Sequence, residues 1–244
     1  MKKFNLISLR TALLVLGLTF GTNITYAQQT ATEAKTTAIG TQKTWGTVDG
    51  MQIIGLVQGP SAAEAELQIA CVFEYTEGDI FNEPALPAAL NGLVHLDEAL
   101  KGNLTSIRKT GKFDGRALET FLISPDNKTL GSKKLLLIGL GDRNNFTPEL
   151  MVQVGEIATR EALKLGVKNF SFASDLKDAG IDSPTALVAG NVVKGIVSEY
   201  RVQNELKAQR LAKFKPLTKV YLLAGPAFFE VAGGGISDAI KEVQ

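Results

Sequence analysis

Two glycine-rich segments are the parts of this 244-residue chain whose residue types could hold a ligand. In the first, Gly139 and Gly141 follow the apolar run Leu135 to Ile138 and precede Asp142. Backbone amides in such a turn can approach a phosphate group, because glycine has no Cβ to block it. The third glycine of a dinucleotide-binding fingerprint is missing, so a tight turn without a ligand explains the same residues.

The second segment is the triplet Gly233, Gly234 and Gly235, which comes just before a possible helix near the C-terminus. A glycine run that opens a helix is a possible anion cradle, since its amides point outward and the helix dipole favours negative charge. A flexible exit of the chain explains the triplet equally well.

The acidic residues and the single histidine form no recognised catalytic motif. His95 lies near Asp97 and Glu98, but residues two or three apart do not share a helix face closely, which favours a solvated polar surface. The loop 174–184 carries three aspartates whose spacing fits no calcium loop. A G-x-S-x-G nucleophile elbow is absent from the sequence. We therefore predict no catalytic residues, no metal site and no cofactor.

Strand-like and helix-like segments alternate along the chain, which predicts an α/β fold: a three-layer arrangement with a mixed sheet flanked by helices. The expected strands are Met51 to Val57, Leu67 to Tyr75, Ala117 to Ile123, Leu135 to Gly139, Asn169 to Ala173 and Lys219 to Ala224. The expected helices are 86–107, one from Thr147 to Gly166, and one from Ser183 to near Arg210. The run 135–138 lacks polar alternation, which predicts a strand near the centre of the sheet.

The N-terminus resembles a secretory signal. Lys2, Lys3 and Arg10 precede the apolar run 11–20, and Thr25-Tyr26-Ala27 offers small residues where a signal peptidase cuts. The run is too short to cross a bilayer, so no stable membrane anchor is expected. We predict a signal peptide at 1–27, a flexible spacer at 28–44 and a single domain at 45–244, with export to the periplasm or the medium.

Composition excludes a general nucleic-acid binder. The chain has 26 Lys plus Arg against 25 Asp plus Glu, and cleavage after Ala27 removes three cations, leaving 23 against 25. This balance provides no basic excess to neutralise phosphates. The single cysteine excludes an intramolecular disulfide.

The order of motifs in the middle of the chain resembles the N-terminal domain of the leucyl aminopeptidase (cytosol aminopeptidase) family. The matching marks are Arg108 to Phe113 at the end of a helix, then Gly115, Glu119-Thr120, the LLLIGLGD turn at 135–142, and Phe146-Thr147. The resemblance extends from about Leu67 to Tyr221. It implies a domain similar to the macro fold, which in that family precedes a linker helix and a catalytic domain with two divalent metals.

The family's catalytic signature, Asn-Thr-Asp-Ala-Glu-Gly-Arg, occurs nowhere in this sequence, so the resemblance carries no catalytic residue over. The leading interpretation is an exported, stand-alone, non-catalytic domain that binds a protein partner or a copy of itself. One alternative is part of an aminopeptidase whose catalytic half is a separate chain.

A further alternative follows from the resemblance to macro domains, which often hold ADP-ribose or related nucleotides in glycine-rich loops. The segment Glu77 to Ile80 resembles the Gly-Asp-Ile found at a strand end in macro domains, and the two glycine segments would then hold the ligand. The glycine triplet, however, lies later in the chain than the macro-domain pattern has it.

Overall fold

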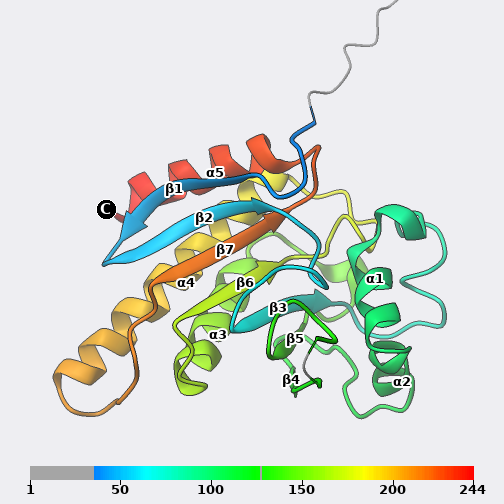
Figure 1. The fold of residues 1–244 in the computed structure, drawn as a ribbon, viewed down its shortest axis with the longest axis horizontal. Helices are drawn as coiled ribbons and strands as arrows, with labels where there is room; N and C mark the ends of the chain where they lie inside the picture. The colour runs from blue at the N-terminus through cyan, green and yellow to red at the C-terminus, as the bar shows by residue number, and fades with distance from the viewer. Residues whose placement is uncertain (1–35, 127) are drawn as a thin grey trace, which may run out of the picture. The chain divides into compact units, whose positions relative to one another are not determined.

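The computed structural model describes residues 36–126 and 128–244, which belong to one structural unit, Ala34–Gln244 (Figure 1). The predicted signal peptide and the first part of the predicted spacer lie outside the described residues. Strand β1 begins at Gln42, so the last three residues of the predicted spacer belong to the sheet.

The described residues form a seven-stranded mixed sheet in the order β1-β2-β7-β6-β3-β5-β4. The five inner strands run parallel, and the edge strands β1 and β4 pair antiparallel with their neighbours. The strands are β1 (Gln42–Val48), β2 (Met51–Val57), β3 (Leu67–Val72), β4 (Thr120–Ile123), β5 (Leu135–Gly139), β6 (Asn169–Ala173) and β7 (Lys219–Ala224).

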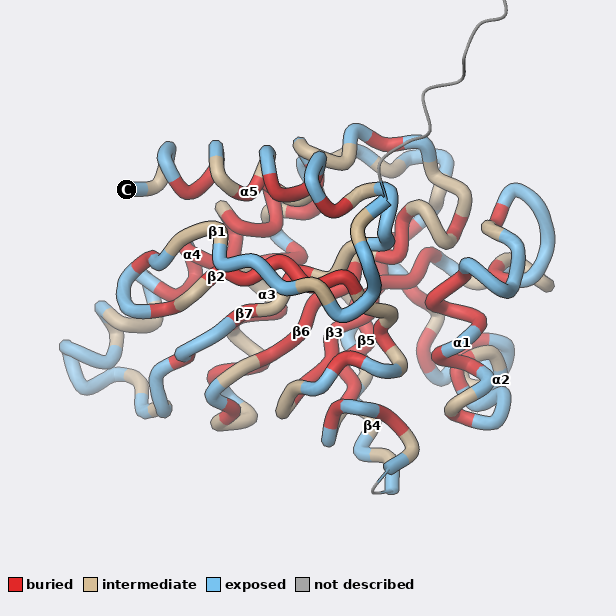
Figure 2. Tube along the Cα trace, turned by 45° about the horizontal axis from the view of Figure 1, so that its top comes forward, coloured by how far each residue is buried: buried red, intermediate tan, exposed pale blue. Residues whose placement is uncertain are grey.

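Helices cover both faces of the sheet, which confirms the predicted three-layer α/β fold. They are α1 (Gly92–Ala99), α2 (Asn103–Lys109), α3 (Leu150–Lys164), α4 (Thr185–Ala208) and α5 (Phe229–Val243). Residues of α3, α4 and α5 share one apolar core with the sheet, and residues of α1 and α2 share a second core on the opposite face. Figure 2 shows buried residues concentrated along the inner strands, and buried residues alternating with exposed ones along α5.

Strand β5 is buried on both faces without being central, which corrects the prediction that it lies near the middle of the sheet. It is the second strand from the β4 edge. Leu136 and Ile138 point into the core with α3 and α4, whereas Leu135 and Leu137 point into the core with α1 and α2. Its continuous apolar run reflects helices on both sides.

The helix predicted over 86–107 is divided in the structure. A short 3-10 helix, Ala88–Leu90, precedes α1. Between α1 and α2, Lys101 and Gly102 take the left-handed conformation, with φ angles of 56° and 78°. The left-handed conformation interrupts the helical hydrogen bonds, so the apolar stripe is shared by two short helices. The predicted helices after Thr147 and Ser183 are confirmed as α3 and α4, although β3 and β4 are shorter than expected.

Candidate functional site

The parallel strands direct five loops to one edge of the sheet, where their carboxyl ends lie. Ligands of open α/β sheets bind outside the carboxyl ends of such strands. The loops after β3, β5 and β6 contain most of the residues that the sequence singled out: Glu77 to Ile80, Gly139 to Asp142, and the aspartates of 174–184. This edge is therefore the candidate site.

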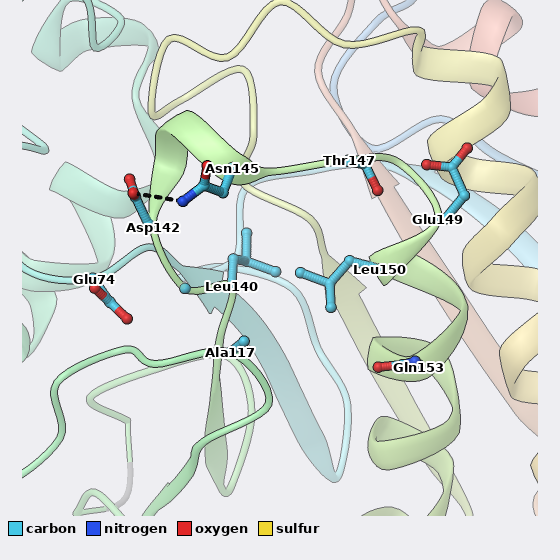
Figure 3. Close-up of a pocket in the computed structure, with 10 residues that line it drawn as sticks. Glu74, Ala117, Leu140, Asp142, Asn145, Thr147, Glu149, Leu150 and Gln153 are labelled. Atoms are coloured by element: carbon cyan, nitrogen blue, oxygen red, sulfur yellow. Dashed lines mark hydrogen bonds between the residues drawn. The ribbon is translucent and has the colours of Figure 1, made fainter.

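A hollow of about 470 Å³ lies where β5 ends and α3 begins, and Figure 3 shows the side chains around it. Of the predicted site residues, Gly141 and Asp142 line it. The other lining residues are Glu74, Ala117, Leu140, Asn145, Thr147, Glu149, Leu150 and Gln153.

The amides of the glycine turn are all engaged by the protein itself. The N–H of Gly139 donates to the carbonyl of Glu119 (N···O 2.8 Å) and that of Gly141 to the carbonyl of Gly115 (2.9 Å). The N–H of Leu140 between them donates to the carbonyl of Val72 (2.8 Å). A phosphate at this turn would have to displace backbone hydrogen bonds. The glycines instead allow close packing, because a Cβ at Gly139 would overlap the backbone of residues 115 and 116.

The charge of the hollow also disfavours an anion. Three carboxyl side chains line it, Glu74, Asp142 and Glu149, and no Lys or Arg is among its lining residues. The hydroxyl of Thr147 donates to Glu149 and lowers the pKa of this carboxyl below its usual range. Asp142 is held by the amide N–H of Asn144 (2.9 Å) and the side-chain amide of Asn145 (2.9 Å). These carboxylates repel a phosphate at neutral pH.

The glycine triplet does not open a helix, so the predicted loop at Gly233 to Gly235 is wrong. All three residues lie inside α5, where their amides belong to a continuous helix. A Cβ at Gly233 would overlap the ring of Trp45, and a Cβ at Gly235 would overlap the carbonyl of Ala186 in α4. The absence of side chains lets α5 approach the β1–β2 hairpin and α4 closely.

Asp79, in the Gly-Asp-Ile segment, is held by a buried ion pair. Both of its carboxylate oxygens accept from the guanidinium of Arg108, which also donates from Nη2 to the carbonyl of Phe73 (2.8 Å). The two side chains are almost fully buried, and the guanidinium lies over the ring of Tyr75. Asp79 therefore fastens the loop after β3 to α2. The sequence indicated only the aspartate, because its partner is 29 residues away.

Two of the three aspartates in 174–184 are turned inward. Asp175, at φ 53°, accepts from the amide of Cys71 in β3 (3.0 Å), and Asp178 accepts from the amide of Gly92 at the start of α1 (3.0 Å). Burial raises the pKa of both carboxyls, that of Asp178 to about 6, and the charge of Asp178 further raises the pKa of Asp175. Asp182 is exposed and pairs with Lys177 (3.0 Å).

The residues around His95 contribute to structure. Asp97 is buried and accepts from the amide (3.0 Å) and hydroxyl (2.8 Å) of Thr105, which joins α1 to α2. Across 36–126 and 128–244, no group of three or more His, Cys, Asp or Glu side chains is arranged to hold a metal ion. Within the same ranges, no helix is both long enough and apolar enough to span a bilayer.

Comparison with known proteins decides the family. Residues 79–209 match the family described as "Cytosol aminopeptidase family, N-terminal domain". The chain belongs to this family. The match confirms the resemblance found in the sequence and lies within the residues that carried it.

The curated relatives of this aminopeptidase-family chain are much longer than the match. A probable cytosol aminopeptidase of Nitrosomonas eutropha is 30% identical over 148 residues, which are 60% of this chain and 29% of the relative. One from Geotalea uraniireducens is 32% identical over 114 residues, 46% of this chain and 23% of the relative. The chain thus spans less than a third of the length of these relatives.

Solved structures with the same fold include a leucine aminopeptidase and a macrodomain. A tomato leucine aminopeptidase mutant superposes with a TM-score of 0.54 at 20% identity, over 76% of this chain and 34% of that one. A macrodomain of Oceanobacillus iheyensis, solved with ADP, gives a TM-score of 0.50 at 16% identity, over 83% and 96%. At these identities the likeness shows the fold alone, which is macrodomain-like as predicted.

Proposed function

We propose that this domain is a protein-association module of the aminopeptidase type, acting through contact with another protein rather than through chemistry of its own. The sequence lacks the metal-binding segment of the family, and the glycine turn that would cradle a nucleotide has its amides engaged by the protein. The loop 73–91, by contrast, exposes large apolar side chains that neither of these features accounts for.

That loop, residues 73–91, carries the proposal. The side-chain amide of Asn91 donates to the carbonyl of Ile80 (3.0 Å) and that of Leu86 (3.2 Å), which draws the two ends of the loop tip together. Phe81 and Leu90 adjoin these contacts, and 50% and 70% of their surfaces are exposed. Apolar side chains held outward on an ordered backbone are typical of protein contact sites, because little conformational entropy is lost on binding.

The first partner to test is the catalytic part of a cytosol aminopeptidase, since about 70% of the Nitrosomonas eutropha relative lies outside the matched region. A second copy of this chain is the other partner to test. Binding to an aminopeptidase from the same cells is measured by calorimetry, and self-association by sedimentation. We expect association with one of them, weakened at least about tenfold by Phe81→Ser with Leu90→Ser, because a contact side chain contributes about 1.4 kcal/mol or more.

The matched control is Leu211→Ser, since Leu211 is as exposed as Leu90 but lies beyond the end of α4. It should leave the affinity unchanged. Absence of both kinds of association at about 100 μM, a concentration that reveals even weak complexes, would refute the proposal. Equal weakening by Leu211→Ser would show that the loop is not the contact site.

Lack of catalysis is tested separately. The purified full chain with zinc or manganese should not hydrolyse leucine anilide above background, because a two-metal hydrolase needs several carboxylates around paired ions. Metal-dependent turnover that survives repurification and is lost in Asp175→Asn or Asp178→Asn would contradict the proposal.

Export to the periplasm or medium is part of the same proposal and rests on the N-terminal pattern of Lys2, Lys3 and the apolar run 11–20. N-terminal sequencing of the protein recovered from cell fractions is the test. A mature form beginning at Gln28 outside the cytoplasm is expected, and an intact N-terminus in the cytoplasm would rule export out.

A further inference from the structure

The loop 174–184, which follows β6, contacts both the carboxyl end of β3 and the segment before α1. The carbonyl of Asp178 accepts from the amide of Leu86 (3.0 Å) and from the side chain of Asn91 (3.1 Å). The side chain of Arg143 donates to the carbonyl of Ala179, and Gly180 packs against Pro84. The loop after β6 therefore packs against residues 84–92 and holds them by hydrogen bonds.

Two carboxyls stand at this junction, the buried Asp175 and the half-buried Asp178, and both accept from backbone amides. Oδ2 of Asp175 accepts from the N–H of Cys71 (3.0 Å), and Oδ2 of Asp178 accepts from the N–H of Gly92 (3.0 Å). Neither carboxyl forms an ion pair with a Lys or Arg of the described ranges. Two neighbouring carboxyls with no Lys or Arg beside them cannot both ionise without a free-energy cost, which the burial of Asp175 increases.

The other titratable groups facing the pair are few. Cys71 of β3 is buried, and burial together with the charge of Asp175 raises the pKa of its thiol, so it stays neutral. His95 of α1 acts on Asp178 through its charge and lowers the pKa of that carboxyl. Arg143 binds a backbone carbonyl of the loop, and Lys177 pairs with the exposed Asp182.

We propose that Asp175 and Asp178 form a proton-dependent latch that fastens residues 84–92 and the start of α1 to the end of β3. With one of the two carboxyls protonated, the pair accepts from Cys71 and Gly92 without mutual repulsion. When the pair loses this proton, two negative charges, that of Asp175 being buried, repel each other and the junction opens locally. The latch lies beneath the loop of the proposed protein contact, but it can be measured without any partner.

Hydrogen exchange of the amides of Cys71 and Gly92, resolved by NMR in the full chain, reads the two bonds directly. After correction for the intrinsic rate, protection in the wild type should fall at least about tenfold from pH 5 to pH 8, the change that corresponds to one pKa unit. In Asp175→Asn, the protection at pH 8 should equal that at pH 5. Asn retains the acceptor oxygen and adopts left-handed backbone angles readily.

Two control variants separate the latch from other causes. Asp182→Asn, in the same loop but exposed, should behave as the wild type. His95→Gln should also keep the pH dependence. Protection that is equal at both pH values in the wild type would overturn the proposal, and so would a fall that persists in Asp175→Asn or vanishes in His95→Gln.

A second measurement keeps the proposal testable if Asp175→Asn does not fold. Carboxyl carbon-13 titration of the wild type should show the pair losing its protons in two separate steps, the later one at pH 6 or above. Both carboxyls titrating together near the ordinary aspartate value would overturn the latch.

Discussion

Gly155 of α3 and Gly195 of α4 face each other where the two helices cross. A Cβ at Gly155 would lie 3.3 Å from the Cα of Gly195 and 2.5 Å from the carbonyl oxygen of Val192. A Cβ at Gly195 would overlap the carbonyl of Val152. The backbones of α3 and α4 are therefore in direct contact, which this pair of glycines makes possible.

The glycine crossing predicts that Gly195→Ala lowers the free energy of unfolding by about 2 kcal/mol or more, because the helices must separate to admit a methyl group. Chemical denaturation measures the loss. The control is Gly234→Ala in α5, where a Cβ meets nothing within 4 Å. Alanine favours a helix over glycine by about 0.5–1 kcal/mol, so this variant should be more stable. A loss at Gly234 equal to that at Gly195 would contradict the packing argument.

Burial of β5 on both faces predicts that Leu137→Asp lowers the stability by on the order of 3 kcal/mol or more, since it places an unpaired charge in the core. Leu122→Asp on the edge strand β4 is the control, because 43% of the Leu122 surface is exposed. Thermal unfolding checks both variants. An unchanged melting temperature for Leu137→Asp would show that β5 is not part of the core.

The buried ion pair predicts that Asp79→Asn lowers the stability by about 3–5 kcal/mol, since it leaves the guanidinium of Arg108 buried without its counter-charge. The double variant Asp79→Leu with Arg108→Met should recover much of that loss, because no charge remains buried. Glu77→Gln, in the exposed neighbouring pair with Lys109, should change little. A loss of stability in the double variant equal to the sum of the losses in its two single variants would mean that the two side chains do not interact.

The raised pKa of Asp178 makes stability depend on pH in a definite direction. Its folded pKa of about 6 lies above the ordinary value of 3.8, so its contribution is complete below that ordinary value and is lost as the pH rises to about 6. Asp178→Asn carries no such titration. The wild type should therefore lose on the order of 2 kcal/mol relative to this variant between pH 4 and pH 6.5. Parallel stability curves from urea unfolding would contradict the assignment.

The engaged glycine amides and the acidic hollow predict no thermal stabilisation by ADP-ribose up to millimolar concentration. A ligand at 100 times its dissociation constant would stabilise by about 2.7 kcal/mol, which thermal unfolding detects readily. The Oceanobacillus iheyensis macrodomain, whose structure holds ADP, serves as the positive control. A rise in melting temperature that disappears in Gly141→Val would instead support a nucleotide site.

Most of the fold could be read from periodicity. The ranges of β2, β5, β6 and β7 match the structure because each is a short apolar run between turn residues. Strand β1 was missed because it is mostly exposed and polar. The glycine triplet was misread because glycine disfavours a helix, and only packing against Trp45 and α4 offsets that preference.

By itself, the sequence determined the family, the α/β class and the strands, because these depend on local patterns and on the order of motifs along the chain. The tertiary structure decided which polar residues pair with one another. Arg108 and Asp79 are 29 residues apart, and Cys71 and Asp175 are 104 residues apart, so no local pattern could pair them. Burial then changed their chemistry: one carboxylate became half of an ion pair, and another took a raised pKa, because a charge out of water needs a partner or a proton.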